Sequence, residues 1–480
     1  MPLITTQADC IVFSSASGSD TLQGAINAAQ SAQKPLFIAG GVYTTPALSI
    51  TASLTVWAAK NSVIIRSSTG NAVSLSIHAA SGRMADVVLS GLSFDGESKS
   101  LASGASGLVN FSQVDRIVVE DCFFWRSNGT GLYLNNTSGR VSSNGFDTCN
   151  TGIYSTNGWG ITIENNTLFN SQNNGIYVTR EPYAASSLGF DGTTIHRNRI
   201  TQTLNTSGGS GQFGNAILCS IVQFVRITDN IISGANYSAI RANFCSDMVI
   251  SGNQINNAKE TAIFVENPSD FSPGWSNVTI SANTLNGVGG GIHLVNNNAG
   301  SRRASVIGNA IYNSLKNSFP EYTSPDTNPA NKYTRITYGS GVIISADCIA
   351  ESNVIENTAG PGIMLSLAGT WNSQTQTNPD RNTISAIVSK NILKYCQVGI
   401  GYNDWDTRGF AEIAGNIIVG ATSAQIIQMQ ATNLSGVPGN PNNGFGPYAI
   451  VSGASDQGST SNAVTNRFSF DRNKVVPATN

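Results

Sequence analysis

The stretch that decides the fold is residues 215–309, where one short phrase occurs four times. The four copies are Asn215-Ala-Ile-Leu218, Ala239-Ile-Arg-Ala-Asn243, Ala262-Ile-Phe-Val-Glu266 and Gly291-Ile-His-Leu-Val295. Between them stand versions of one turn: Asp229-Asn230, Gly252-Asn253, Ala282-Asn283 and Gly308-Asn309. A phrase that recurs with a period of roughly 20–50 residues is typical of a stacked solenoid. The residues that differ between copies are then the candidates for function.

The same turn can be followed through most of the chain. Its positions are Asp121, Asn144, Asn166, Asn198, Asn230, Asn253, Asn283, Asn309, Asn353, Asn391 and Asn416. The shortest steps suit one coil of three short strands and three turns, and Asn tolerates the left-handed backbone of such turns. The leucine-rich repeat pattern with a similar period is absent. We therefore predict an all-β protein, a single-stranded right-handed parallel β-helix of about a dozen coils.

The composition agrees with short strands rather than long helices. Charged residues make up 11% of the chain, against about 25% in an average domain, and there are 49 glycines. The formal net charge of −2 argues against a nucleic-acid partner or an anionic membrane surface. No apolar run is long enough to span a membrane. The first residues show no secretion signal.

Three segments are expected. Residues 1–47 form an N-terminal segment with a capping helix at 22–33, because Leu22, Ile26 and Ala29 share one helical face. Residues 48–430 form the β-helix. Residues 431–480 form a loop rich in Gly, Pro and Asn, followed by a second cap.

Longer steps between turns mark insertions, at 179–192, 203–214, 267–277, 313–340, 367–385 and, more briefly, 403–409. Each enters just before or just after the same strand of the coil. Insertions in repeat proteins commonly collect on the binding face. We therefore expect loops that wall a groove over one sheet.

In the repeated strand, Ile and Val should point into the coil, so the alternate positions point outward. The first outward row is Tyr133, Tyr154, Tyr177, Leu218, Arg241, Phe264, His293, Ile343, Met364 and Gly401. The second is Asn135, Thr156, Thr179, Ser220, Asn243, Glu266, Val295, Ser345, Ser366 and Asn403. The middle of this face should carry one exposed strip, consisting of Arg241, Asn243, Phe264, Glu266 and His293.

The candidate catalytic residues come from this strip and its walls. They are Glu266, Asp270, Glu181, Arg241 and His293. Glycoside cleavage usually needs two carboxylates, which Glu266 with Asp270 or Glu181 could supply. Alternatively, Glu266 is a solvated rim carboxylate, Arg241 forms a surface ion pair with it, and His293 is a hydrogen-bonded surface residue.

The candidate substrate-binding residues are Tyr154, Tyr177, Arg180, Asn243, Phe264, Trp275 and Asn296. Tyrosine rings on an exposed strip offer flat apolar surfaces with polar tips, on which sugar rings stack. The alternative is that outward tyrosines only stabilise their strands. Leu218, Ile343 and Met364 are also predicted outward, either covered by insertions or marking a dimer or trimer surface.

No cofactor or metal is expected. The seven cysteines form no CxxC pair or Cys/His cluster, and there are only three histidines. Most of the cysteines are interpreted as small buried hydrophobic residues.

The body of the chain resembles the pectate-lyase-like superfamily of right-handed β-helices, on the opening helix and Gly91-Leu-Ser-Phe-Asp-Gly96. More narrowly, Ser210-Gly-Gln-Phe-Gly-Asn-Ala-Ile217, Ser238-Ala-Ile-Arg-Ala-Asn243 and Asn353-Val-Ile-Glu-Asn-Thr-Ala-Gly-Pro-Gly-Ile-Met-Leu365 resemble a bacterial family of twin-arginine-exported repeat proteins of unassigned function. That resemblance implies export to the periplasm or the extracellular space, although the twin-arginine leader is not present. The pattern of calcium-dependent pectate lyases is not evident.

A fainter resemblance is to inulin fructotransferases, through Ala262-Ile-Phe-Val-Glu-Asn267. It implies an acidic catalytic role for Glu266.

Three functions remain open, all with a poly- or oligosaccharide as partner. The first is a glycoside hydrolase or fructotransferase-like enzyme with Glu266 as acid or base. The second is a polysaccharide lyase or uronate epimerase, in which Arg241 neutralises a uronate and His293 or Tyr177 abstracts the proton. The third is a non-catalytic adhesin or tailspike-like glycan binder. The fold alone does not choose among them.

Overall fold

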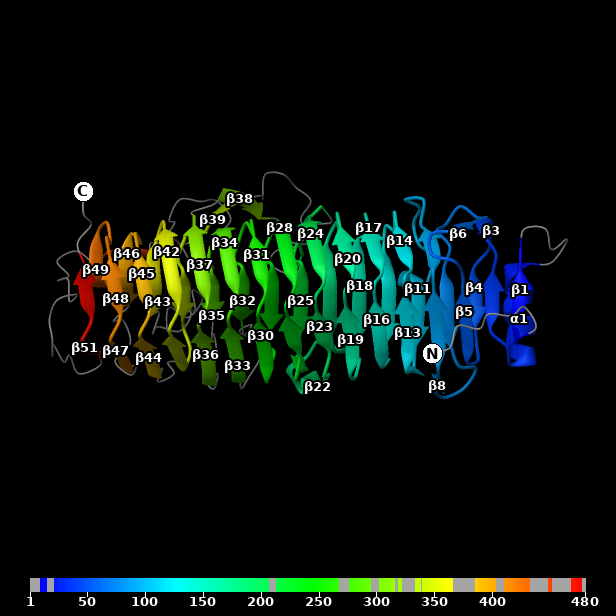
Figure 1. Ribbon diagram of the computed structural model, residues 1–480, viewed down its shortest axis with the longest axis horizontal. Coiled ribbons are helices and arrows are strands. Elements are labelled where there is room, and N and C mark those ends of the chain that lie inside the picture. The colour runs from blue at the N-terminus through cyan, green and yellow to red at the C-terminus, as the bar shows by residue number, and fades with distance from the viewer. Residues whose placement is uncertain are drawn as a thin grey trace. The chain divides into compact units, whose positions relative to one another are not determined.

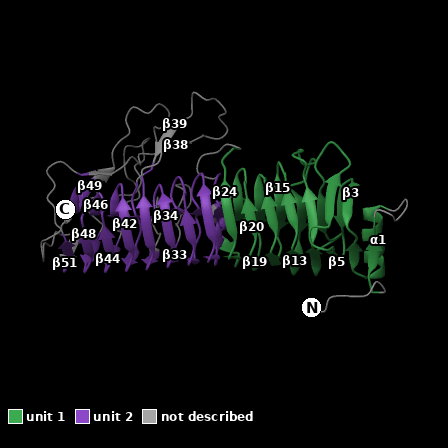
Figure 2. Cartoon of the chain, turned by 45° about the horizontal axis from the view of Figure 1, so that its top comes forward, with its two compact units in different colours: residues 1–182, 189–207 green, residues 183–188, 208–480 purple. Residues whose placement is uncertain are grey.

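The computed structural model describes most of the chain. The described residues are 9–14, 21–206, 213–266, 276–294, 302–315, 318–321, 333–337, 339–365, 385–402, 410–431, 448–450 and 468–476. They fall into two compact units, residues 1–182 with 189–207 and residues 183–188 with 208–480 (Figure 2). In each unit every coil contributes strands to three sheets, which we name sheets A, B and C (Figure 1).

Unit 1 contains the first coils. Sheet A holds β1 (Ile11–Phe13), β2 (Leu36–Ile38), β5 (Leu54–Trp57), β9 (Val87–Ser90), β13 (Ile117–Glu120), β16 (Gly139–Ser142), β19 (Ile161–Glu164) and β23 (Thr194–His196). Sheet B holds β3 (Gly41–Thr45), β6 (Val63–Ser67), β10 (Leu92–Asp95), β14 (Phe123–Trp125), β17 (Gly145–Asp147), β20 (Thr167–Phe169) and β24 (Arg199–Thr203). Sheet C holds β4 (Leu48–Ile50), β7 (Leu75–His78), β11 (Gly107–Ser112), β15 (Thr130–Asn135), β18 (Thr151–Thr156) and β21 (Asn174–Thr179). The short strands β8 (Met84–Ala85), β12 (Val114–Asp115) and β22 (Gly189–Phe190) lie outside these sheets.

Unit 2 repeats the arrangement. Sheet A holds β27 (Arg226–Thr228), β30 (Met248–Ser251), β33 (Ser276–Ser281), β36 (Arg302–Ile307), β41 (Cys348–Glu351), β44 (Ser385–Ser389), β47 (Phe410–Ala414) and β51 (Phe468–Asp471). Sheet B holds β28 (Ile231–Ala235), β31 (Gln254–Asn256), β34 (Thr284–Val288), β37 (Ala310–Ser314), β42 (Val354–Thr358), β45 (Ile392–Lys394), β48 (Ile417–Val419) and β52 (Lys474–Val476). Sheet C holds β25 (Ile217–Ser220), β29 (Ile240–Asn243), β32 (Ile263–Glu266), β35 (Ile292–Leu294), β40 (Val342–Ile344), β43 (Pro361–Leu365), β46 (Val398–Tyr402), β49 (Ala424–Ala431) and β50 (Tyr448–Ile450). The other elements are a 3-10 turn η2 (Ala185–Ser187), β26 (Val222–Gln223) and an antiparallel pair, β38 (Ser318–Glu321) and β39 (Tyr333–Ile336).

The predicted fold class is confirmed: the protein is a single-stranded right-handed parallel β-helix. The predicted capping helix is also present, as α1 (Leu22–Ala32). It begins at Thr21, whose side chain accepts a hydrogen bond from the Gly24 amide, and it buries Leu22, Ile26 and Ala29. Strands on the two sides of each predicted boundary, at residues 47 and 431, pair with each other, since β3 pairs with β6 and β47 pairs with β51.

The recurring Asn forms a buried ladder inside the coils. In unit 2 it runs through Asn230, Asn253, Asn283, Asn309, Asn353, Asn391, Asn416 and Asn473, and each amide donates to the side-chain oxygen of the next at 2.9–3.0 Å. In unit 1 it runs through Asn144, Asn166 and Asn198. The ladder supplies partners for buried backbone amides that the bend between sheets A and B would leave without one.

Two details of the turn differ from the expectation. The residue with the left-handed backbone is the one before the ladder Asn, as at Asp229 (φ 55°) and Ala282 (φ 55°). This conformation turns the chain so that the side chain of the following Asn points into the coil. Asp121 therefore occupies the left-handed position (φ 54°). The ladder position of that coil belongs to Cys122, whose amide donates to Asn144.

The core consists of the inward rows, which are almost fully buried. In sheet B of unit 1, Phe94, Phe124 and Phe146 are aligned in register and stack with ring centroids 5.4 and 4.8 Å apart. Burying one such ring stabilises the fold by roughly 1.5–3 kcal/mol. The interior aromatic stack therefore fixes the register of the coils that carry the outward rows.

Some residues predicted to point outward are nevertheless buried. Leu218 is 1% exposed, Ile343 2% and Met364 0%. Ile343 and Met364 belong to a cluster that also contains Ile427 and Met429. Gly401 makes room for it, because a Cβ there would lie 2.6 Å from the Met429 sulfur and 2.9 Å from that of Met364. Leu218, Ile343 and Met364 are therefore covered within the protein.

Candidate functional site

The candidate site lies on the outer side of sheet C in unit 2, at β29, β32 and β35. The parallel pairing of these strands places Arg241 beside Phe264, Phe264 beside His293, and Asn243 beside Glu266. These are the neighbours that the two predicted rows place together. The alternation of the repeat therefore positions these five side chains on adjacent coils.

Arg241 is the centre of the site, clamped between two carboxylates. Its Nε and Nη2 donate to one oxygen of Glu266, Oε1, at 3.1 and 2.7 Å. Its Nη1 donates to Oε2 of Glu260 at 3.1 Å, and Nε also reaches Oδ1 of Asn243 at 3.3 Å. A planar guanidinium holds its partners in fixed directions, so the clamp sets the orientation of both carboxylates.

Glu260 is the functional-site residue that sequence reasoning missed. It precedes β32 in the turn, and its side chain is 5% exposed. Ser238, on the preceding coil, donates its hydroxyl to Glu260 Oε2 at 2.7 Å. The only sequence signal is that Glu260 stands just before a copy of the repeated phrase. That position lies outside the two outward rows from which the candidates were drawn.

The expectation of an exposed strip is wrong. Asn243 is 1% exposed, His293 3%, and Arg241 and Phe264 6% each. The Arg241 guanidinium carbon lies 4.5 Å from the centre of the Phe264 ring, which is 4.8 Å from the His293 ring. Alternation fixes which side of the sheet a side chain takes, whereas burial depends on what packs over that side. Only the Glu266 side chain, 19% exposed, reaches the surface.

The tyrosine row lies on sheet C of unit 1. Tyr133 and Tyr154 meet edge to face at 5.3 Å, and Tyr154 and Tyr177 stack at 4.7 Å. The Tyr154 hydroxyl donates to Glu181 Oε1 at 3.1 Å. Burial, with the nearby Tyr177 and Glu181, raises the pKa of Tyr154. This hydroxyl therefore acts as a hydrogen-bond donor and is unsuited to serve as a base.

The remaining candidates divide between the units or lie outside the described residues. The backbone amide of Glu181 donates to Oδ1 of Asn157 at 2.9 Å. Arg180 donates from Nη1 to the Phe190 carbonyl at 2.8 Å. Both belong to unit 1, whereas the Arg241 clamp belongs to unit 2. Asp270, Trp275 and Asn296 lie outside the described residues, so the pairing of Glu266 with Asp270 stays a prediction.

Asp191 in unit 1 is a buried acid that the sequence did not single out. It is 0% exposed, its Oδ1 accepts from the Thr193 amide at 3.2 Å, and its Oδ2 has no hydrogen-bond partner in the described part of the chain. Burial raises the pKa of Asp191 to about 6, against the hydrogen bonds from Thr193 and the charge of Arg180. Because it is enclosed, Asp191 is a pH-sensitive structural group and does not contact substrate.

We expect Asp191→Asn to stabilise the protein by about 3 kcal/mol at pH 7.5. The pKa of Asp191 in the folded state lies above its ordinary value of 3.8, so the contribution of this carboxyl to stability is greatest below about pH 4 and is lost as the pH rises through 6. Asn does not ionise, so the advantage of the variant should vanish near pH 4. Urea denaturation at several pH values measures the difference, and an advantage that is independent of pH would contradict the assignment.

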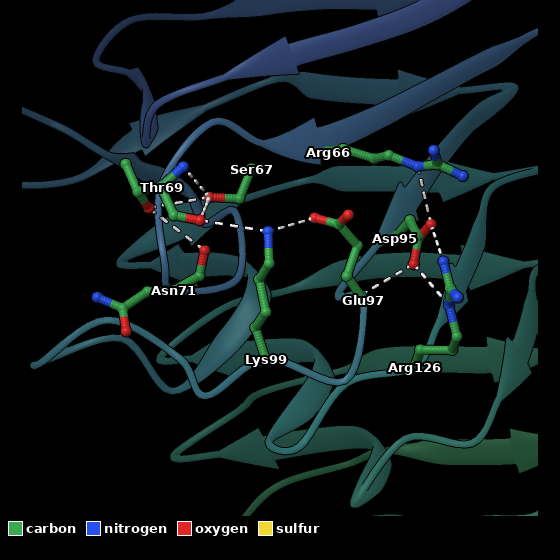
Figure 3. Close-up of polar contacts among 8 residues, drawn as sticks. All are labelled: Arg66, Ser67, Thr69, Asn71, Asp95, Glu97, Lys99 and Arg126. Carbon is green, nitrogen blue, oxygen red and sulfur yellow. Dashed lines mark hydrogen bonds and ion pairs between the residues drawn. The ribbon is translucent and has the colours of Figure 1, made fainter.

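A second charged cluster lies in unit 1, at the ends of β6, β10 and β14 (Figure 3). Asp95 is fully buried and accepts from Arg66 Nε at 3.0 Å, Arg126 Nε at 2.9 Å and the Glu97 amide at 2.9 Å. Burial alone would raise the pKa of the Asp95 carboxyl, but the bonds from Arg126 and the Glu97 amide, with the charges of Arg126 and Arg66, hold it below its ordinary value. Both carboxylate oxygens of Asp95 are occupied by these hydrogen bonds, which join three neighbouring coils. Its role is therefore structural.

The described part of the chain contains no group of three or more His, Cys, Asp or Glu able to hold a metal ion. The seven cysteines form no disulfide, and all except Cys10 are buried, as expected. Within the same residues, none of the helices has the length and apolarity needed to cross a membrane.

Comparisons with solved structures find similar chains at low identity. A mannuronic-acid-specific polysaccharide family 6 lyase from human gut microbiota is 11% identical, with 86% of this chain and 82% of that chain covered and a TM-score of 0.43. The Streptococcus pneumoniae surface protein and adhesin PfbA is 13% identical, with 84% and 94% covered and a TM-score of 0.44. The tailspike protein of E. coli bacteriophage HK620, solved with a pentasaccharide, is 11% identical, with 85% and 76% covered and a TM-score of 0.49.

No curated protein matches the chain in sequence. The family described as the right-handed β-helix region matches residues 52–187 and 162–318. These two overlapping matches, the three parallel sheets and the Asn ladder agree with one another. Because the two family matches together cover more than half of the chain, the protein belongs to the right-handed β-helix family.

Proposed function

We propose that this protein is a carbohydrate-active enzyme that cleaves or rearranges glycosidic bonds of a poly- or oligosaccharide, with Glu266 as the reacting carboxylate. One observation carries the proposal. Arg241 binds Glu266 through Oε1 alone, which leaves Oε2 outside the clamp, on the one side chain of the strip that reaches the surface. A carboxylate held in a fixed direction at the surface is suited to act as base or nucleophile on a bound sugar.

The charge of the site favours a neutral glycan. Arg241 contributes one positive charge, and Glu260 and Glu266 contribute two negative charges within 3.1 Å of it. The described cation of the site, Arg241, already binds two carboxylates, so a uronate carboxylate would find no further positive charge there. This disfavours the lyase or epimerase alternative, which needs a cation for the uronate and a base that His293, at 3% exposure, does not present.

The tyrosine row supports glycan binding. Tyr133, Tyr154 and Tyr177 are half-buried, with Tyr154 stacked on Tyr177 and edge to face with Tyr133, and the Tyr154 hydroxyl donates to Glu181. Such surfaces bind sugar faces while the hydroxyl groups are held at the edge. A protein that acts on polysaccharides meets them outside the cytoplasm, so we also propose that it is exported. Fractionation of the cells that produce it tests this location.

The decisive test compares wild type with Glu266→Gln on a library of neutral glycans and uronate polymers. We expect new reducing ends or cyclic sugars from a neutral glycan, and at least about a hundredfold loss of turnover in Glu266→Gln. The matched control is Glu351→Gln, because Glu351 is a surface carboxylate of sheet A that is paired with Lys390 at 2.6 Å. This variant should keep full activity.

Two results would overturn the proposal. Release of an unsaturated uronate, seen as ultraviolet absorbance, would establish the lyase. Glycan binding by wild type and Glu266→Gln with equal affinity, without turnover of any substrate, would establish the adhesin. Circular dichroism of both variants verifies that they fold.

A further inference from the structure

Sheet B of unit 2 carries a polar hollow on its outer side, away from the Arg241 clamp on sheet C. Its volume is about 640 Å³, and it is lined by Gln254, Asn256, Thr284, Asn286, Tyr312, Asn313, Glu356, Asn357 and Tyr395. These residues lie in β31, β34, β37 and β42, except Tyr395, which directly follows β45. Successive coils thus contribute equivalent positions, with Asn286 paired with Tyr312 and Tyr312 with Glu356.

An amide chain fixes the direction of the polar groups at one edge of the hollow. Asn357 donates from Nδ2 to Asn313 Oδ1 at 2.6 Å, and Asn313 donates from Nδ2 to Asn286 Oδ1 at 2.8 Å. Asn357 and Asn313 each use one N–H bond in this chain and retain the other, whereas Asn286 only accepts in it. The three residues therefore present donors that are oriented before any ligand arrives, which lowers the entropy cost of binding.

Two tyrosines add flat apolar surface to these amides. Tyr395 is 53% exposed and Tyr312 is half-buried, and both line the hollow. Coils are spaced by roughly 4.8 Å, so the amides and rings recur at a regular interval along the sheet. A linear chain of sugars has faces for the rings and hydroxyl groups for the amides at a similarly regular interval.

The charge of the hollow restricts its ligand. Among the described residues that line it, Glu356 is the one acidic side chain, and none is basic. The lining itself offers no cation to a phosphate, sulfate or uronate; Lys394, which is paired with Glu356 on the next coil, is not part of it. Sugar hydroxyl groups, in contrast, can donate to the Glu356 carboxylate and to the amide oxygens.

We propose that this face is a second glycan-binding site, which takes a neutral oligosaccharide and holds it without cleaving it. This binding site is additional to the proposed activity of sheet C. Each of the two proposals can be refuted without refuting the other. Glu356 contacts the sugar hydroxyl groups, Tyr395 stacks on a sugar face, and the Asn286–Asn313–Asn357 chain orients the ligand. A long glycan bound here would be retained near the same unit's sheet C.

The test measures binding of neutral oligosaccharides, from glucans, mannans and fructans, by titration calorimetry. The background is Glu266→Gln, so that substrate is not consumed. We expect Tyr395→Asn to weaken binding at least about tenfold, because it removes the ring, while Asn tolerates the left-handed backbone at this position (φ 52°). Glu356→Gln should also weaken binding.

The matched control is Phe410→Ala, which removes an aromatic side chain of sheet A that is 47% exposed. It should bind as the parent does. Unchanged affinity in both Tyr395→Asn and Glu356→Gln would overturn the second site and show that the amide chain only stabilises its turns. Turnover is measured separately in the wild-type background. Loss of binding in the sheet B variants, with cleavage of short substrates retained, supports the second site. Absence of all turnover refutes only the proposed activity.

Discussion

Replacement of Arg241 by Ala is expected to lower the free energy of unfolding by about 3–5 kcal/mol. The guanidinium is 7% exposed and donates to Glu260 and Glu266. Its removal takes the paired cation away from the Glu260 carboxylate, which is 5% exposed and also accepts from the Ser238 hydroxyl. Loss of the cationic partner of a buried carboxylate is among the most costly defects a single substitution can create. Urea denaturation followed by circular dichroism measures the effect.

The double variant Arg241→Met with Glu260→Gln provides the control. It removes both buried charges of the pair, so it should recover much of the stability that Arg241→Ala loses. Glu266→Gln alone should cost clearly less, because Glu266 is the more exposed partner and Gln can still accept from Arg241. A loss below about 1 kcal/mol for Arg241→Ala would show that the clamp contributes little to the fold.

Replacement of Asn309 by Ala is expected to cost about 3 kcal/mol. The Asn309 Oδ1 accepts from the backbone and side-chain amides of Asn283, both at 3.0 Å, and its Nδ2 donates to the Ile280 carbonyl at 3.0 Å. Asn309 is 1% exposed, so water cannot replace these partners. A buried backbone N–H and a buried carbonyl would then lack hydrogen bonds in the middle of unit 2.

The last Asn of the ladder is the matched control. Asn473 accepts from Asn416 and donates to the Ile413 carbonyl with the same geometry, but it is only partly buried. Water can reach its partners, so Asn473→Ala should cost about 1 kcal/mol. Equal losses for Asn309→Ala and Asn473→Ala would mean that the ladder stabilises the protein through local turn geometry rather than through buried hydrogen bonds.

The sequence was sufficient for the fold because each coil repeats the same physical solution. Alternation of Ile and Val with variable residues sets the inward rows, and the recurring Asn marks one bend in each coil. Together they fix the register that places Arg241 beside Phe264 and Asn243 beside Glu266. The position of the left-handed residue in the bend could not be predicted, because the residue before each Asn is not of one type. It is Asp229, Gly252 or Ala282 in successive coils.

The candidate site was predicted only in part. Membership of the strip follows from local periodicity, which the sequence displays directly. Burial of Arg241 and His293 does not, because it depends on atoms from other parts of the chain. The same limit applies to Glu260, which enters the site from a turn and is recognised only once its carboxylate is found on the guanidinium.

The sequence by itself thus determined the coil, its register and the side of the sheet that each residue takes, since these are properties of neighbours along the chain and of a fixed period. Tertiary structure alone decided which outward residues are covered, which carboxylates share Arg241 and where sheet B forms a hollow. The physical reason is that solvent exposure and hydrogen-bond partnership are set by distances between coils and turns that are far apart in sequence.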